Sequence, residues 1–150
     1  MHKTSKKDAI GLMIKQESLL AKLYKLFAEQ FPEHRETWSE LAAEEKKHAN
    51  WLRQLGDAVE KGIVGFEEGR FKAPALKIYI AHLEQIIARA EKKELTLTSA
   101  VSYTVDFERS LIEKNVFTHF DSASEQARSV LNRLKSETEA HIQKIQTIDP

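Results

Sequence analysis

One pair of residues in this chain has the spacing of a metal-binding motif. Glu45 and His48 lie three positions apart in a stretch whose apolar residues recur with helical periodicity. At this spacing a helix presents a carboxylate and an imidazole from one face, one turn apart, so both can reach the same metal ion. The same spacing also arises by chance in helices rich in Glu and His. The direction in which the helix points the two side chains therefore decides what the motif means.

The heptad register of the helical stretches on either side of Pro32 directs three polar side chains inward. Glu17 falls on the apolar row of the first stretch, and Glu45 and His48 fall on the apolar rows of the second. Glu17 lies 15 residues before Pro32 and Glu45 lies 13 residues after it. In an antiparallel helix pair with a rise of 1.5 Å per residue, the two carboxylates would differ in height by about 3 Å. The register thus predicts that they meet.

The second half of the chain repeats this pattern in part. Glu108 and His141 also lie on inward rows, and 33 residues separate them, close to the 31 residues between Glu17 and His48. Each pair spans one helical hairpin. We interpret the two halves as a degenerate repeat that contributes to one site.

Inward carboxylates on several helices need a common explanation. A lone carboxylate in a helical core costs several kcal/mol unless it is paired, protonated or bound to a cation. The chain has no cysteine, which excludes disulfides, thiolate zinc sites, iron–sulfur clusters and catalytic thiols. Glu and His ligands suit one or two iron ions, and manganese or zinc are alternatives. We therefore expect a metal site built from Glu and His.

The placement of Pro and Gly predicts an all-α fold with two helical hairpins joined by a long connection. Gly62, Gly65 and Gly69 precede Pro74, which is tolerated in the first turn of a helix. This connection contains a short amphipathic helix, so the arrangement is that of a ferritin-like four-helix bundle with one crossover. We expect a single domain over residues 1–150, with helices roughly at 5–30, 33–61, 74–92, 97–119 and 123–148.

Charge and hydropathy exclude two classes of partner. The 23 basic and 23 acidic residues give a formal net charge of zero, so there is no electrostatic footprint for nucleic acid. No run approaches the ~20 apolar residues that span a bilayer, so no membrane association is expected. With no apolar stretch near its N-terminus that reads as a secretory signal, the chain is expected to be cytoplasmic.

Several motifs resemble those of the rubrerythrin branch of the ferritin-like superfamily over nearly the whole chain. They are Glu17 with Tyr24 seven residues later, Glu45-Lys46-Lys47-His48, and Phe107-Glu108-Arg109-Ser110. The dimetal centre of that family takes one Glu from each of helices A and C and a Glu-x-x-His from each of helices B and D. The resemblance therefore implies metal ligands at Glu17, Glu45, His48, Glu108 and His141.

The chain departs from the family pattern at two positions. Thr138 stands where the helix D motif has its Glu, and Leu111 stands where rubrerythrins carry a further helix C Glu. Glu137 lies four residues before His141 and is a candidate substitute ligand. Three carboxylates leave two divalent ions with a charge of +1 unless a hydroxide bridges them, whereas Glu137 would bring neutrality. Both one and two metal ions remain compatible with the sequence.

The resemblance implies oxidation of Fe(II) by O₂ or peroxide, as an oxidase, ferroxidase or peroxidase. Without cysteine the chain has no rubredoxin domain, so such turnover needs an external electron donor. Homodimers are expected from the resemblance alone. The alternative interpretation is a ferritin-like bundle with a degenerate site, acting as a structural or partner-binding module. In that case His48 would be a core histidine hydrogen-bonded to Glu17 or Glu45.

Overall fold

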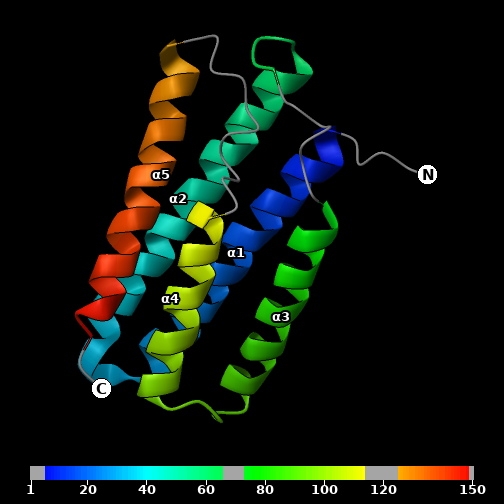
Figure 1. Ribbon diagram of the computed structural model, residues 1–150. Helices are drawn as coiled ribbons and strands as arrows, with labels where there is room; N and C mark the ends of the chain where they lie inside the picture. The colour runs from blue at the N-terminus through cyan, green and yellow to red at the C-terminus, as the bar shows by residue number, and fades with distance from the viewer. Residues whose placement is uncertain (1–5, 66–72, 114–124, 149–150) are drawn as a thin grey trace.

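The structure is a computed structural model that describes residues 6–65, 73–113 and 125–148. Within these ranges all regular secondary structure is helical and no strand occurs, which confirms the predicted all-α class (Figure 1). The elements are α1 (Lys6–Gln30), the short 3-10 helix η1 (Pro32–His34), α2 (Arg35–Glu60), α3 (Ala73–Glu91), α4 (Leu97–Glu113) and α5 (Glu125–Gln146). The last part of the helix predicted at 97–119 lies outside the described residues.

A tight turn makes α1 and α2 an antiparallel hairpin. Pro32 occupies the first position of η1, where its missing N–H costs nothing. The backbone N–H of Phe31 donates to the carbonyl of Phe27, and the N–H of His34 donates to the carbonyl of Phe31. These bonds satisfy groups that a helix end leaves free. The hairpin thereby sets Glu17 opposite Glu45.

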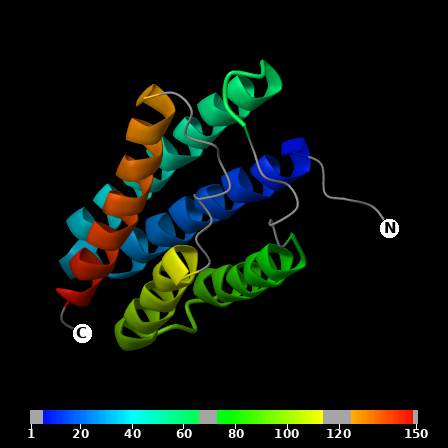
Figure 2. The same cartoon turned by 45° about the horizontal axis from the view of Figure 1, so that its top comes forward.

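The crossover runs along the length of the bundle. In Figures 1 and 2, α2 and α4 point in the same direction, and α3 returns the chain between them along the outer side of α1. Exposed ion pairs, Lys15–Glu84 at 3.6 Å and Lys22–Glu91 at 3.7 Å, lie along the α1–α3 contact. The helices α1, α2, α4 and α5 form the four-helix core, so the ferritin-like topology with one crossover is confirmed.

The chain reverses between α3 and α4 in a short, well-capped loop. Lys93 adopts a positive φ of 59°, a conformation common at helix C-termini, and its N–H donates to the carbonyl of Ala90. The hydroxyl of Thr96 accepts a 3.1 Å hydrogen bond from the N–H of Ser99, which caps the start of α4. These caps fix where α4 begins and therefore the height of Glu108.

The inward rows expected from the heptads are buried. Trp38, Leu41, Leu52, Leu55 and Val59 of α2 are at most 7% exposed. Leu131, Leu134 and Ile145 of α5 are also buried, as is Ile148 just after its end. The four-helix core is thus apolar except at one level. None of the described helices is long and apolar enough to cross a membrane.

Candidate metal centre

Polar side chains from all four core helices meet at one level of the four-helix core. The five residues that share the site are at most 1% exposed, and they come from α1, α2, α4 and α5: Glu17, Glu45, His48, Glu108 and His141. They are carried by rows whose other members are apolar, so the helical register that buries the core also buries these groups. The structure therefore brings together five of the six residues expected from the sequence.

The two imidazoles turn the same ring nitrogen toward the carboxylates. Nδ1 of His48 lies 3.6 Å from Oε2 of Glu45 and 3.9 Å from Oε2 of Glu17. Nδ1 of His141 lies 2.8 Å from Oε1 of Glu45 and 3.5 Å from Oε1 of Glu108. Glu45 thus faces both histidines, one with each carboxylate oxygen. The site consists of two halves, Glu17 with His48 and Glu108 with His141, that share Glu45.

Many polar atoms in the site lack a hydrogen-bond partner within the described residues. They are both carboxylate oxygens of Glu17 and of Glu45, Oε2 of Glu108, and Nδ1 of His48 and of His141. Buried polar atoms are normally paired, because each unpaired one costs about 1–3 kcal/mol. Carboxylate oxygens and imidazole nitrogens are ligands of iron, manganese and zinc. Ligand atoms of Glu45, His48 and His141 lie within 4.8 Å of one another, so the donor set fits a metal centre.

Without a metal ion, protons have to balance these charges. Burial raises the pKa of Glu17 well above its ordinary value, and the charge of Glu45 adds to this effect. Burial by itself lowers the pKa of His48, but its interactions with Glu17 and Glu45 outweigh burial and raise that pKa to about 10. In the same way, Glu108 and Glu45 outweigh burial and raise the pKa of His141 to about 11. At neutral pH both imidazoles of the metal-free site are therefore protonated.

Tyr24 holds one carboxylate of the site in place. Its hydroxyl donates a 2.5 Å hydrogen bond to Oε1 of Glu108, with both residues buried. Burial, followed by the charge of Glu108, raises the pKa of Tyr24 well above its ordinary value, so the phenol keeps its proton and remains a donor. This bond leaves Oε2 of Glu108 as the free oxygen.

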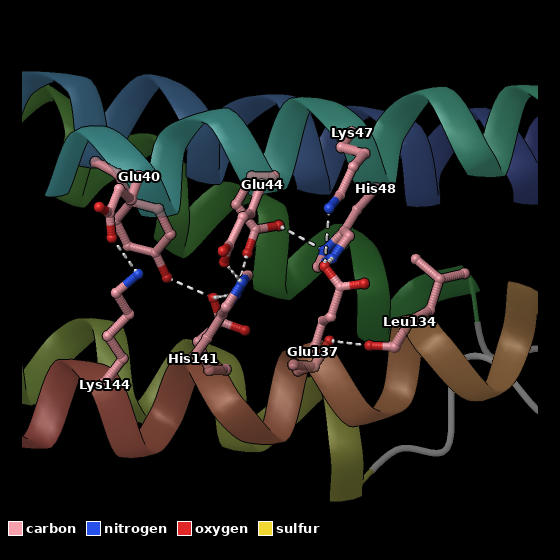
Figure 3. A network of polar contacts seen from close by, with 12 residues as sticks. Glu40, Glu44, Lys47, His48, Leu134, Glu137, His141 and Lys144 are labelled. Carbon is pink, nitrogen blue, oxygen red and sulfur yellow. Dashed lines mark hydrogen bonds and ion pairs between the residues drawn. The ribbon is translucent and has the colours of Figure 1, made fainter. Parts of the chain in front are cut away.

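The outer nitrogens of the two histidines face carboxylates from the opposite helix. Nε2 of His48 on α2 lies 3.4 Å from Oε1 of Glu137 on α5. Nε2 of His141 on α5 is hydrogen-bonded to Oε2 of Glu44 on α2. Each glutamate stands four residues before the histidine of its own helix and contacts the histidine of the other (Figure 3). We call Glu44 and Glu137 the crossed carboxylates.

Glu137 therefore lies on the side of His48 away from Glu17 and Glu45. Lys47 is also near it, with Nζ 3.3 Å from Oε1. Partial burial raises the pKa of Glu137, but Lys47 and His48 outweigh this and lower it below the ordinary value. The place expected for a helix D Glu holds the buried Thr138, whose hydroxyl donates a 2.7 Å hydrogen bond to the carbonyl of Leu134.

Glu44 is the residue of the site that the sequence did not predict. Its run, Glu44-Glu45-Lys46-Lys47, reads mostly as a solvated helix surface, and the side chain of Glu44 is indeed 34% exposed. A usable signal was present in the spacing, because Glu44 precedes His48 by four residues just as Glu137 precedes His141. A carboxylate that accepts a hydrogen bond from the outer ring nitrogen commonly orients an imidazole that binds metal.

A comparison with protein families shows which family this bundle belongs to. The family model for rubrerythrin matches residues 8–142. The chain belongs to the rubrerythrin family. No curated protein and no solved structure matches it.

Family membership agrees with the position of the site in the bundle. This rubrerythrin-family chain is a ferritin-like helical bundle with a candidate Glu and His metal-binding group at mid-height. The matched segment contains all five residues that converge in the core, together with both crossed carboxylates. The rubrerythrin resemblance inferred from the motifs is confirmed.

Proposed function

We propose that the protein binds a pair of non-haem iron ions and uses them to reduce O₂ or peroxide. The observation that carries the proposal is the position of Glu45, which offers one oxygen toward each imidazole. Glu17 with His48 would help to hold one ion, Glu108 with His141 would help to hold the other, and Glu45 could contribute a carboxylate oxygen to each. Iron held by these residues would supply the electrons for reduction of the oxidant, through oxidation of Fe(II) to Fe(III).

The residues of the chain set the conditions for this chemistry. The five ligand side chains are at most 1% exposed, so the site is dry and charges interact strongly there. Tyr24 keeps one oxygen of Glu108 occupied and directs the other into the site. The crossed carboxylates accept hydrogen bonds from Nε2 of both imidazoles and leave Nδ1 for metal.

A second candidate function is a structural or partner-binding module with a degenerate site. Thr138 favours it, because its hydroxyl is used by the backbone of α5 and offers no carboxylate. In this case the buried histidines would remain protonated and paired with Glu17, Glu45 and Glu108. Metal binding separates the two functions.

The test is the metal content of the purified protein after anaerobic loading with Fe(II) and removal of free iron. The proposal predicts about two iron ions per chain for the wild type, and a large loss for Glu45→Ala. Glu40→Ala is the matched control, because Glu40 lies on the same helix and pairs with Lys144 outside the ligand set. Exposure to peroxide should then produce the near-ultraviolet band of a ferric pair. Wild-type protein with less than ~0.2 iron per chain would favour the structural module.

We also propose that the protein forms homodimers through α3. This helix covers the outer side of α1 in Figure 1. Its Ile78 is 72% exposed. An exposed large apolar side chain on the crossover helix favours an interface there. Light scattering of wild type and Ile78→Glu tests the proposal, since a monomeric wild type would refute it.

A further inference from the structure

A surface groove between α1 and α2 is lined by cations. It has a volume of about 470 Å³ and is open to solvent. Its floor is formed by the buried Ala21 and Ala49, whose small side chains leave the space between the two helices unfilled. None of the described residues that line it carries a carboxylate; the others are Ser18, Lys22, Lys25, Lys46, Asn50 and Arg53. We call this feature the α1–α2 groove.

Three of the four cations in the groove have no acidic partner among the residues that the structure describes. Only Lys22 is paired, with its Nζ 3.7 Å from a carboxylate oxygen of Glu91 on α3. Lys25, Lys46 and Arg53 form no ion pair within the described ranges. The positive charge of these three side chains is therefore left for a ligand to neutralise.

The nearby carboxylates of α1 and α2 are directed away from the groove. Glu17 and Glu45 are buried in the core, at the candidate metal centre. Glu44 is bonded to His141, so it contacts α5. Because the whole chain has zero net charge, the positive potential of the groove is a local feature.

Arg53 and Asn50 are arranged so that the groove presents hydrogen-bond donors. Nη1 of Arg53 donates a 2.7 Å hydrogen bond to Oδ1 of Asn50, which lies one turn earlier on α2. This bond occupies the carboxamide oxygen and leaves the side-chain amide of Asn50, which has two N–H donors. The guanidinium keeps further N–H donors of its own. A ligand that is negatively charged and rich in acceptor oxygens matches this lining.

The cations are spread along the groove, which favours a ligand with several anionic groups. Lys46 and Arg53 are seven residues apart on α2, so their Cα atoms differ in height by about 10 Å. Lys25 is on the facing helix α1. A single orthophosphate would require the three cations to converge against their mutual repulsion. A chain of linked phosphates offers oxygens to all three in extended positions.

We propose that the α1–α2 groove binds a linear oligophosphate, either inorganic or as the phosphate chain of a nucleotide. Lys25, Lys46 and Arg53 pair with the phosphate oxygens, and Arg53 can do so with two parallel N–H donors. The amide of Asn50 donates to another oxygen. None of these residues is a proposed metal ligand, so the site does not depend on the proposed function.

The first test is calorimetric titration of the full-length protein, prepared without metal because phosphate chains chelate divalent cations. Inorganic triphosphate at low ionic strength should bind with one molecule per chain, and more tightly than orthophosphate. Salt at about 0.5 M should weaken this binding strongly. A parallel titration with ATP distinguishes the two sources, since equal affinity indicates the phosphate chain alone and tighter binding indicates a nucleotide. No saturable binding of either ligand at low salt would overturn the site.

Charge variants locate the binding site. Lys25→Gln and Lys46→Gln should each weaken the binding of triphosphate by roughly threefold to tenfold, because each removes a charged contact at an exposed position. Lys47→Gln is the matched control. It removes the same charge from the next residue of α2, but Lys47 lies 3.3 Å from Glu137 on α5 and does not line the groove. Equal losses of affinity in Lys46→Gln and Lys47→Gln would overturn the site, because they would reflect net charge alone.

Asn50→Asp tests the donor character of the groove with almost no change of shape. The new carboxylate would pair with Arg53 and repel phosphate, so affinity should fall by more than about tenfold. Asn50 is exposed, and circular dichroism checks that the variant is folded. In amide NMR spectra of the wild type, triphosphate should shift resonances of groove residues such as Ser18 and Ala49 but not that of Lys77 on α3. Wild-type affinity in Asn50→Asp, or shifts only outside the groove, would overturn the proposal.

Discussion

The phenol of Tyr24 on α1 donates a 2.5 Å hydrogen bond to the carboxylate of Glu108 on α4, and this bond ties the two helical hairpins together at the candidate metal centre. Both residues are fully buried. A hydrogen bond to a charged group is worth roughly 1.5–3 kcal/mol, more than an ordinary one. The bond thus stabilises the metal-free bundle and also positions a proposed metal ligand.

We predict that Tyr24→Phe lowers both stability and metal affinity. Glu108 would lose its donor and keep its burial, so the free energy of unfolding of the metal-free protein should fall by about 2–3 kcal/mol. Urea unfolding measures this loss. Binding of iron or Zn²⁺ should restore part of the lost stability, because the freed oxygen of Glu108 then contacts a cation.

Tyr79→Phe is the matched control for this prediction. Tyr79 is also buried, and its hydroxyl donates a 3.1 Å hydrogen bond to the backbone carbonyl of Phe107, outside the ligand set. This variant should lose about 1 kcal/mol and keep the metal affinity of the wild type. Equal effects of the two variants on metal affinity would show that the Tyr24 bond has no special part in the site.

The crossed carboxylates predict a second set of variants. Glu44→Gln and Glu137→Gln should each lower metal affinity by roughly 10- to 100-fold, because each removes the charged acceptor that orients one imidazole. The number of metal ions bound at saturation should stay the same. Competition with a chelator gives the affinities, and the visible spectrum of bound Co²⁺ reports any change in coordination.

Glu40→Gln tests whether any carboxylate along the α2–α5 seam has this effect. Glu40 bonds Lys144 one turn from Glu44 and contacts neither histidine within the described residues (Figure 3). The metal affinity of the Glu40→Gln variant should equal that of the wild type. A lower stoichiometry in Glu137→Gln alone would instead indicate that Glu137 moves to ligate the metal directly.

The heptad pattern was sufficient to predict the fold, for a physical reason. Burial of an apolar face determines which side of each helix turns inward, and that side can be read from spacing alone. The same spacing therefore also located the inward polar residues, such as Glu17 and His141. The crossover was predictable because Pro74 follows a glycine-containing linker that is too long for a hairpin turn.

Contacts between side chains on different helices were beyond the reach of the sequence. Whether Glu137 faces the metal or the outer nitrogen of His48 depends on helix rotation and rotamer, which spacing does not determine. Glu44 was masked by its charged neighbours, since a run of Glu and Lys usually marks a solvated surface. The stacking of the His48 ring on α2 with the His141 ring on α5, whose centroids lie 5.2 Å apart, likewise follows from the packing of these two helices.

We predict that metal binding releases protons and becomes tighter as the pH rises. With a pKa of about 10 for His48 and about 11 for His141, both imidazoles carry a proton at pH 7 that a metal at Nδ1 must displace. About two protons should therefore leave the histidines. Calorimetry of Zn²⁺ binding in buffers of different ionisation enthalpy counts them. No release at neutral pH would mean that the imidazoles are already neutral.

The same pKa shifts predict how the stability of the metal-free protein depends on pH. The pKa of both histidines is higher in the folded state than the value of about 6.5 in the unfolded chain. Their contribution is thus complete below pH 6.5 and is lost as the pH rises through about 10 and 11. Thermal unfolding at pH 7 and at high pH should show the loss, and bound metal should remove it.

Thr138→Glu is expected to lower the stability of the metal-free protein and to raise its affinity for metal. Thr138 is buried three residues before His141, so a carboxylate there adds a fourth negative charge to the site. Without metal this charge is uncompensated and should cost about 3 kcal/mol, or roughly 6–12 °C in Tm. With metal it becomes a ligand, and affinity should rise by roughly 10- to 100-fold. Thr138→Gln has the same size without the charge and should show neither the charge penalty nor the gain in affinity, so equal metal affinities in the two variants would place position 138 outside the reach of the metal.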